Sequence, residues 1–96
     1  MRAYVIVEME VTDPVKIEQY RARAGASVTA HGGRFVVRGG TAEALEGGWQ
    51  PKRIVVLEFP DMTRARSWWQ SQDYAAARVI RNQAASTRMI LVEGVG

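Results

Sequence analysis

Apolar and polar residues alternate along four short segments of the chain, and this alternation predicts β-strands. The four expected strands span residues 3–9, 34–38, 53–59 and 88–93. The first strand places Val5 and Val7 on one face and Tyr4 and Ile6 on the other, because successive side chains point to opposite sides of a strand. Both faces carry apolar side chains, so neither face is expected to remain in water.

Two segments between these strands have apolar residues at spacings of three and four, which predicts helices. The first helix is expected to begin at Asp13-Pro14, where the carboxylate can cap free amides, and to run to about Ala30. The second is expected to begin at Asp61 and to break near Ser71, which can cap a further helical stretch. A long connection, residues 39–51, joins the second strand to the third.

The chain also repeats itself. Residues 5–9, Val-Ile-Val-Glu-Met, return as residues 55–59, Val-Val-Leu-Glu-Phe, and an Asp-led helix start follows each copy. Two strand–helix–strand units in tandem predict an α+β, ferredoxin-like fold, with a split βαβ repeat in one domain over residues 1–96. Such a fold has a four-stranded antiparallel sheet with helices on one face.

The sheet face that the helices leave uncovered is expected to be apolar, with charged residues among its members. The residues expected there are Tyr4, Ile6, Glu8, Val36, Ile54, Val56 and Glu58. An apolar area of this size is unusual on a soluble monomer, so we expect a homodimer in which two such faces pack together. Glu8 and Glu58 are expected near the same end of two adjacent parallel strands, where arginines pair with them and fix the register of the two sheets.

Composition excludes several kinds of chemistry. The chain has 13 basic and 10 acidic residues, a net charge of +3, one histidine and no cysteine. Disulfides, thiolate nucleophiles and multi-histidine metal sites are therefore excluded, and no metal or cofactor is expected. The arginines are scattered rather than gathered with aromatic residues, so no nucleic-acid partner is expected. No apolar run approaches the roughly 20 residues of a membrane span, so no membrane partner is expected and a cytoplasmic location is the default.

Three longer stretches resemble a known family. They are residues 3–8, residues 31–40 and residues 49–53 running into 57–60, and the closing residues 91–94 extend the likeness. Together they are similar to the bacterial domain-of-unknown-function family 1330, in the dimeric α+β barrel superfamily. The resemblance implies a ferredoxin-like homodimer, but no activity, because that family is defined without one. Other members of the superfamily include cofactor-free monooxygenases, haem-degrading enzymes and lactone isomerases, and none of their catalytic motifs matches this chain residue by residue.

A few residues can carry chemistry, each with a structural alternative. His31 can act as a general acid or base, as a single axial ligand to haem, or as a cap at the end of the first helix. Arg34 and Arg38 can bind an anion together, or pair with the glutamates of the interface. Tyr20 and Trp68 can line a pocket for a flat aromatic molecule, or belong to the core.

Trp49 lies inside the long connection, where it can cover a pocket or the partner subunit, or anchor the loop on its own domain. With these residues, the sequence favours a homodimer that binds a small acidic or aromatic molecule near the sheet and the dimer interface. Two alternatives stay open. One is a cofactor-independent enzyme of the monooxygenase or isomerase type with His31 as acid or base, and the other is a purely structural or regulatory dimer.

Overall fold

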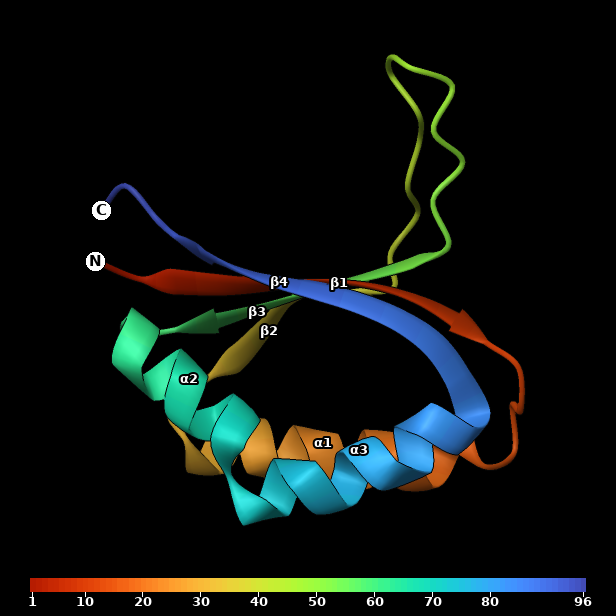
Figure 1. Cartoon of the computed structure of the whole chain (residues 1–96). Helices are drawn as coiled ribbons and strands as arrows, with labels where there is room; N and C mark the ends of the chain where they lie inside the picture. The colour runs from red at the N-terminus through yellow and green to blue at the C-terminus, as the bar shows by residue number, and fades with distance from the viewer.

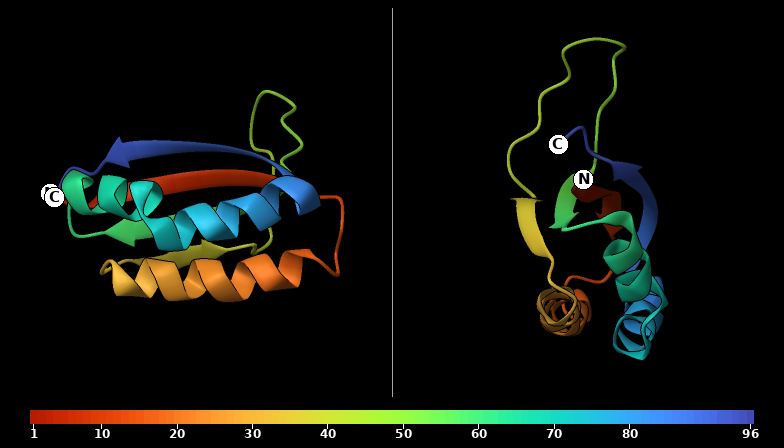
Figure 2. Two further views of the ribbon diagram at one scale, coloured as in Figure 1. Left: turned by 60° about the horizontal axis from the view of Figure 1, so that its bottom comes forward. Right: turned by 90° about the vertical axis from the view of Figure 1, so that its left-hand side faces the viewer.

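A computed structural model describes residues 1–96 as a four-stranded sheet with three helices on one face (Figure 1). The elements are β1 (Ala3–Val11), α1 (Ile17–Ala30), β2 (Arg34–Arg38), β3 (Arg53–Phe59), α2 (Met62–Gln70), α3 (Gln72–Ala84) and β4 (Ala85–Glu93). The strands lie in the order β2-β3-β1-β4, and every neighbouring pair is antiparallel. The view along the strands in Figure 2 shows the two layers, sheet and helices. This is the ferredoxin-like α+β arrangement that the repeat predicts.

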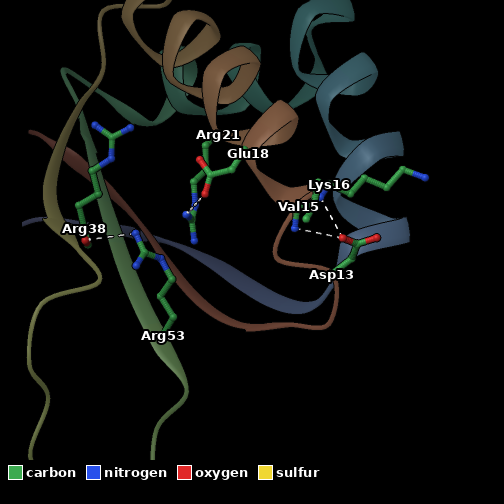
Figure 3. A network of polar contacts seen from close by, with 7 residues as sticks. All are labelled: Asp13, Val15, Lys16, Glu18, Arg21, Arg38 and Arg53. Carbon is green, nitrogen blue, oxygen red and sulfur yellow. Dashed lines mark hydrogen bonds and ion pairs between the residues drawn. The ribbon is translucent and has the colours of Figure 1, made fainter.

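The ends of the helices follow the capping residues of the sequence. The carboxylate of Asp61 accepts a hydrogen bond from the Arg64 amide at the start of α2, and the hydroxyl of Ser71 accepts one from the Tyr74 amide at the start of α3. Asp13 accepts hydrogen bonds from the amides of Val15 and Lys16 (Figure 3), but the α-helix proper begins only at Ile17. Helix α1 is therefore shorter at its start than the position of Asp13-Pro14 predicts.

Two strands are longer than their alternating pattern predicts. Strand β1 continues to Val11 and strand β4 begins at Ala85, because these two segments pair with each other over their whole length from Ala3↔Glu93 to Val11↔Ala85. Short residues such as Ala85 and Ser86 give no strand signal on their own. Pairing with β1 supplies hydrogen bonds that the local sequence does not reveal.

The core lies between the sheet and the helices. Val5 and Val7 of β1 are 3% exposed, and Tyr20 of α1 and Trp68 of α2 are 8% and 1% exposed. The faces expected for β1 are thus confirmed. Tyr20 and Trp68 both belong to the core between the helices and the sheet. The adjacent Trp69 points outward, where the Arg78 guanidinium lies 4.2 Å from its ring centre.

Strand β2 contains a bulge that changes which residues share a face. Phe35 pairs with Leu57, but the next paired residue is Val37, opposite Val56, and Arg38 lies opposite Val55. Simple alternation predicts Arg38 on the uncovered face with Val36, and this prediction is wrong. The extra residue brings Arg38 to the helix side of the sheet, and Val37 to the uncovered side.

The uncovered face of the sheet, which we call the open face, is apolar as expected. Its exposed apolar side chains are Ile6 (38%), Val36 (40%), Val37 (38%), Ile90 (59%) and Val92 (41%). The connection between β2 and β3 projects away from the helices on this same side (Figure 1), and it carries Trp49, which is 56% exposed. The open face is therefore broader than the sequence predicts, because β4 adds Ile90 and Val92.

The two glutamates of the open face lie apart, which corrects the expectation that they lie close together. Strands β1 and β3 are antiparallel rather than parallel, and Glu58 lies opposite Tyr4 whereas Glu8 lies opposite Ile54. Each glutamate has its own partners within the protomer. Glu58 pairs with Arg2 at 2.8 Å and Arg34 at 2.9 Å. Glu8 pairs with Arg88 at 2.6 Å. Because both charges are already compensated, neither glutamate needs a charge from a second subunit.

Candidate functional site

A cavity of about 50 Å³ lies between α1 and the strands β1, β2 and β3, and we call it the α1 cavity. Its walls are mainly apolar, with Val7, Val55 and Leu57 from the sheet and Ala24 and Val28 from the helix. Ten of its thirteen lining residues are hydrophobic. Polar atoms are therefore few, and they come from three arginines and Tyr20.

Arg21, Arg38 and Arg53 line this cavity and are among its more exposed lining residues. We call them the arginine cluster (Figure 3). Arg21 reaches from α1 toward the sheet and pairs with Glu18, and its side chain is 36% exposed. Arg53 donates to the carbonyl oxygen of Arg38 at 3.3 Å, and the Arg38 guanidinium lies 4.0 Å from the ring centre of Phe35. Neither Arg38 nor Arg53 forms an ion pair, so three positive charges face one carboxylate.

The positive charge of Arg53 is destabilised by its surroundings in the cluster. Partial burial lowers the pKa of the Arg53 guanidinium, the charges of Arg21 and Arg38 lower it further, and Glu18 opposes them. Arginine stays charged at any physiological pH, so the lowered pKa reflects partial burial and, after it, repulsion by Arg21 and Arg38 rather than loss of a proton. An anion placed among the three guanidinium groups would relieve this repulsion.

Tyr20 begins a buried chain of hydrogen bonds at the cavity wall. Its hydroxyl lies 2.9 Å from the hydroxyl of Tyr74, and Arg81 donates to the Tyr74 oxygen at 2.8 Å. Burial, followed by the neighbouring Tyr74, raises the pKa of Tyr20 far above its usual value. The phenol therefore stays neutral and acts as a hydrogen-bond group rather than as a base.

Trp68 forms the wall between the α1 cavity and a second hollow. Its indole N–H donates to the hydroxyl of Ser27 at 3.0 Å, and its ring packs 4.2 Å from Tyr74 and 5.4 Å from Phe59, measured between ring centres. The second hollow is a groove of about 330 Å³ between α2, α3 and β4, and we call it the β4 groove. Two buried atoms among the residues that line this groove, Nε of Arg81 and Oγ1 of Thr87, have no hydrogen-bond partner.

His31 lies outside the α1 cavity. Its Nδ1 donates to the carbonyl oxygen of Ser27 at 2.8 Å, and its backbone amide donates to the carbonyl oxygen of Val28. His31 thus caps the C-terminal end of α1. His31 also lines a hollow with Arg64 and Ser67, and none of these three residues lines the α1 cavity.

The structure brings together three of the five residues for which the sequence suggests ligand binding. Tyr20, Arg38 and Trp68 all line the α1 cavity. Arg34 is on the open face, where it pairs with Glu58, so it cannot bind one anion together with Arg38. Trp49 lies on the open face as well, where its indole N–H donates to Glu8 at 3.3 Å.

Among the arginine and aromatic residues of the cavity, three were not predicted as site residues. These are Arg21, Phe35 and Arg53. A signal for Arg53 existed, because it alternates in step with Val55 and Leu57 and must share their face. Arg21 gave a weaker signal, because it lies four residues after Ile17 and three before Ala24, at the edge of the buried stripe of α1.

Acidic residues and histidine do not gather in any group of three that could hold a metal ion. None of the three helices has the length and apolar character needed to cross a bilayer.

A family model described as "Domain of unknown function (DUF1330)" matches residues 2–95 of this chain. No curated protein sequence matches it. The family expected from the sequence stretches above is thereby confirmed.

Solved structures share the fold at low sequence identity. RPA0582 of Rhodopseudomonas palustris, a protein of unknown function, has a TM-score of 0.74 and 17% identity over 99% of this chain and 83% of its own. SnoaB of Streptomyces nogalater, a cofactor-independent oxygenase, has a TM-score of 0.69 and 13% identity over 99% and 94%. A dimeric ferredoxin-like protein of unknown function from Bacteroides fragilis has a TM-score of 0.56 and 11% identity over 97% and 96%. Identities this low show the fold alone.

Proposed function

Because the chain belongs to the DUF1330 family, whose description assigns no activity, we propose its function from the site itself: the protein binds a small organic anion in the α1 cavity. The observation that carries the proposal is the arginine cluster, in which three guanidinium groups with one carboxylate between them border an apolar cavity. Guanidinium groups bind carboxylates and phosphates through paired hydrogen bonds. The ligand would place its anionic group among the arginines and its apolar part between α1 and the sheet.

The size of the cavity favours a short acid over a flat aromatic molecule. Its volume of about 50 Å³ corresponds to roughly two water molecules, at about 30 Å³ each in the liquid. An aromatic ring is larger than this, so the aromatic ligand suggested by Tyr20 and Trp68 requires the walls to move. A short aliphatic chain requires less movement, because its charged group would lie between the arginines, which are among the more exposed residues of the cavity lining.

Thermal unfolding with matched ligands tests the proposal. Isobutyrate and isobutyramide have the same shape, but only the acid is charged, and a ligand at 100 times its Kd adds about 2.7 kcal/mol of stability. We expect isobutyrate to raise the Tm and isobutyramide to leave it unchanged. Arg53→Met and Arg38→Met should remove the rise, because they delete two cations without a carboxylate partner.

Arg23→Met is the matched control. Arg23 is an exposed residue of α1 that does not line the cavity, so its replacement changes the net charge of the protein by the same amount. The rise with isobutyrate should survive in this variant. Equal losses in Arg23→Met and Arg53→Met would mean that the acid responds to overall charge, and the cavity would not be its binding site.

We also propose that the protein is a homodimer joined through the open face. The support is the row of exposed apolar side chains on this face, together with the dimeric ferredoxin-like protein of Bacteroides fragilis that shares the fold. Burying such a row against its own copy removes apolar surface from water. Native mass spectrometry and sedimentation at micromolar concentration should show two chains, and a monomer under both conditions would contradict the proposal.

Cofactor-independent oxygenation is a second candidate function, which the likeness to SnoaB favours. In such a reaction the arginine cluster would stabilise an anionic form of the substrate. His31 would be the acid or base, although its ring lies outside the α1 cavity. Oxygen uptake with catechol and 1,4-dihydroxynaphthalene tests this function. Uptake by the wild-type protein that is lost in Arg53→Met supports this function, whereas no uptake above the uncatalysed rate argues against it. Unchanged uptake in His31→Ala removes His31 from the mechanism.

A further inference from the structure

The hydroxyl groups of Tyr20 and Tyr74 have more hydrogens than the surrounding protein can accept. Each tyrosine contributes one O–H, and the only hydrogen bond between them joins the two oxygen atoms at 2.9 Å. The third member of the chain, Arg81, donates to Tyr74 and cannot accept, because a guanidinium group has no acceptor atom. One hydroxyl hydrogen of the pair is therefore left without an acceptor from the protein.

Burial decides which of the two hydrogens is left over. Tyr74 is 0% exposed and lines neither the α1 cavity nor the β4 groove, whereas Tyr20 is 8% exposed and lines the α1 cavity. A buried donor without an acceptor is costly. The arrangement that avoids this cost has Arg81 donating to Tyr74, Tyr74 donating to Tyr20, and Tyr20 directing its own hydrogen toward the cavity.

We propose that the Tyr20 hydroxyl donates a hydrogen bond to an oxygen atom of the ligand, in the part of the α1 cavity away from the arginine cluster. This inference rests on the proposed function and makes it more specific. The ligand then has two polar ends, an anionic group for the arginines and an uncharged acceptor oxygen for Tyr20. Short oxo acids have this combination, whereas simple fatty acids have only the first group.

The neutrality of Tyr20 suits this role. Burial and the neighbouring Tyr74 keep the phenol protonated throughout the neutral pH range, so the hydrogen is always available. Tyr74 and Arg81 leave Tyr20 as the free donor, because Arg81 donates to Tyr74 and Tyr74 donates to Tyr20. They do not touch the ligand themselves.

Pairs of acids that differ in one atom group test the proposal. Pyruvate and methacrylate have the same shape, with a ketone oxygen in the first and a methylene group in the second. The pair of 4-oxopentanoate and 4-methylenepentanoate offers the same contrast at a greater distance from the carboxylate. We expect the wild-type protein to bind the oxo acid of at least one pair about five- to tenfold more tightly than its methylene analogue, the range of one net hydrogen bond to a buried donor.

Two phenylalanine variants locate the donor. Tyr20→Phe should abolish the preference for the oxo acid while the affinity for the methylene acid stays the same. Tyr74→Phe should retain the preference, because Tyr20 keeps its hydrogen, and it is the matched control for loss of one phenol. Should either variant fail to fold, wild-type protein labelled with ¹³C at the phenol carbon of tyrosine gives the same answer, since the Tyr20 signal should move with the oxo acid alone.

The outcomes separate this inference from the proposed function. Acids that bind without any preference, or a preference that survives in Tyr20→Phe, would overturn the role of Tyr20. A ¹³C signal of Tyr20 that moves equally with both acids of a pair would do the same. In each case the proposed binding of the anionic group by the arginine cluster would still stand. If none of the four acids binds, the proposed function itself fails and the role of Tyr20 fails with it.

Discussion

The hydrogen bond between Ser27 and Trp68 gives the most direct test of how the cavity wall is held. Ser27 is 2% exposed, and its hydroxyl donates to the Ala24 carbonyl oxygen at 2.8 Å and accepts from the Trp68 indole at 3.0 Å. The change Ser27→Ala removes the acceptor but leaves the indole N–H, and Trp68 is 1% exposed. Water cannot reach the indole to replace the lost partner.

The magnitude follows from this burial. An unsatisfied buried donor costs about 1–3 kcal/mol, whereas alanine favours a helix over serine by about 0.5 kcal/mol. We therefore expect Ser27→Ala to lower the free energy of unfolding by about 1.5 kcal/mol. For a chain near 100 residues, each kcal/mol changes the Tm by about 4–8 °C, so the Tm should fall by about 6–12 °C.

A double-mutant cycle with Trp68→Phe isolates the bond. Phenylalanine has no N–H, so in that background Ser27→Ala should cost nearly nothing, or be slightly favourable through helix propensity. Urea unfolding followed by circular dichroism, at one fixed protein concentration because the protein is expected to dimerise, measures all four variants. If Ser27→Ala costs as much in the Trp68→Phe background as in the wild type, the indole bond does not hold the wall and the reasoning fails.

Three further predictions concern the β4 groove and the open face. Thr87→Val should raise the unfolding free energy by about 1 kcal/mol in urea unfolding, because it replaces an unpartnered buried hydroxyl by a methyl group of the same shape. A loss of stability would show that the hydroxyl has a partner after all. The Arg88 side chain, the Lys52 amide and the Trp49 indole lower the pKa of Glu8 below its usual value of 4.5 against a smaller opposing effect of burial, so its contribution to stability is present above that pH and disappears as the pH falls through the lowered pKa. The Tm difference between wild type and Glu8→Gln should accordingly shrink between pH 6 and pH 3, and a constant difference would contradict the assignment. Ile6→Asp should give a monomer in sedimentation, whereas the control Val79→Asp, at an exposed apolar residue of α3, should leave the dimer intact. Equal dissociation in both would mean that the open face is not the interface.

The local pattern of the sequence was enough to predict the fold, because both halves of the chain carry the same signals for a strand followed by a helix. The alternation of Val5 and Val7, the Asp-led helix starts and the break at Ser71 all lie within a few residues of the structure they predict. Each of these features depends on neighbouring residues along the chain, through capping, side-chain alternation or helical spacing. The apolar open face followed from the same alternation.

The candidate site was less accessible to sequence reasoning, because it depends on contacts between elements. Arg38 reaches the cavity through the bulge in β2, and only the pairing of β2 with β3 shows that bulge. Glu8 and Glu58 were expected together because adjacent, parallel strands were expected for them, whereas the antiparallel register of β1 and β3 places them at opposite ends.

The sequence by itself determined the order of strands and helices, the side of β1 that faces the core, and the apolar character of the uncovered sheet face. All of these are short-range properties, since they follow from the period of the side chains along one element. Only the tertiary structure decided that Arg21, Arg38 and Arg53 line one cavity and that the hydroxyl groups of Tyr20 and Tyr74 are hydrogen-bonded to each other. The physical reason is that register, bulges and helix placement are set by packing between distant segments, and a side chain's direction in space is known only when its partner strand or helix is in place.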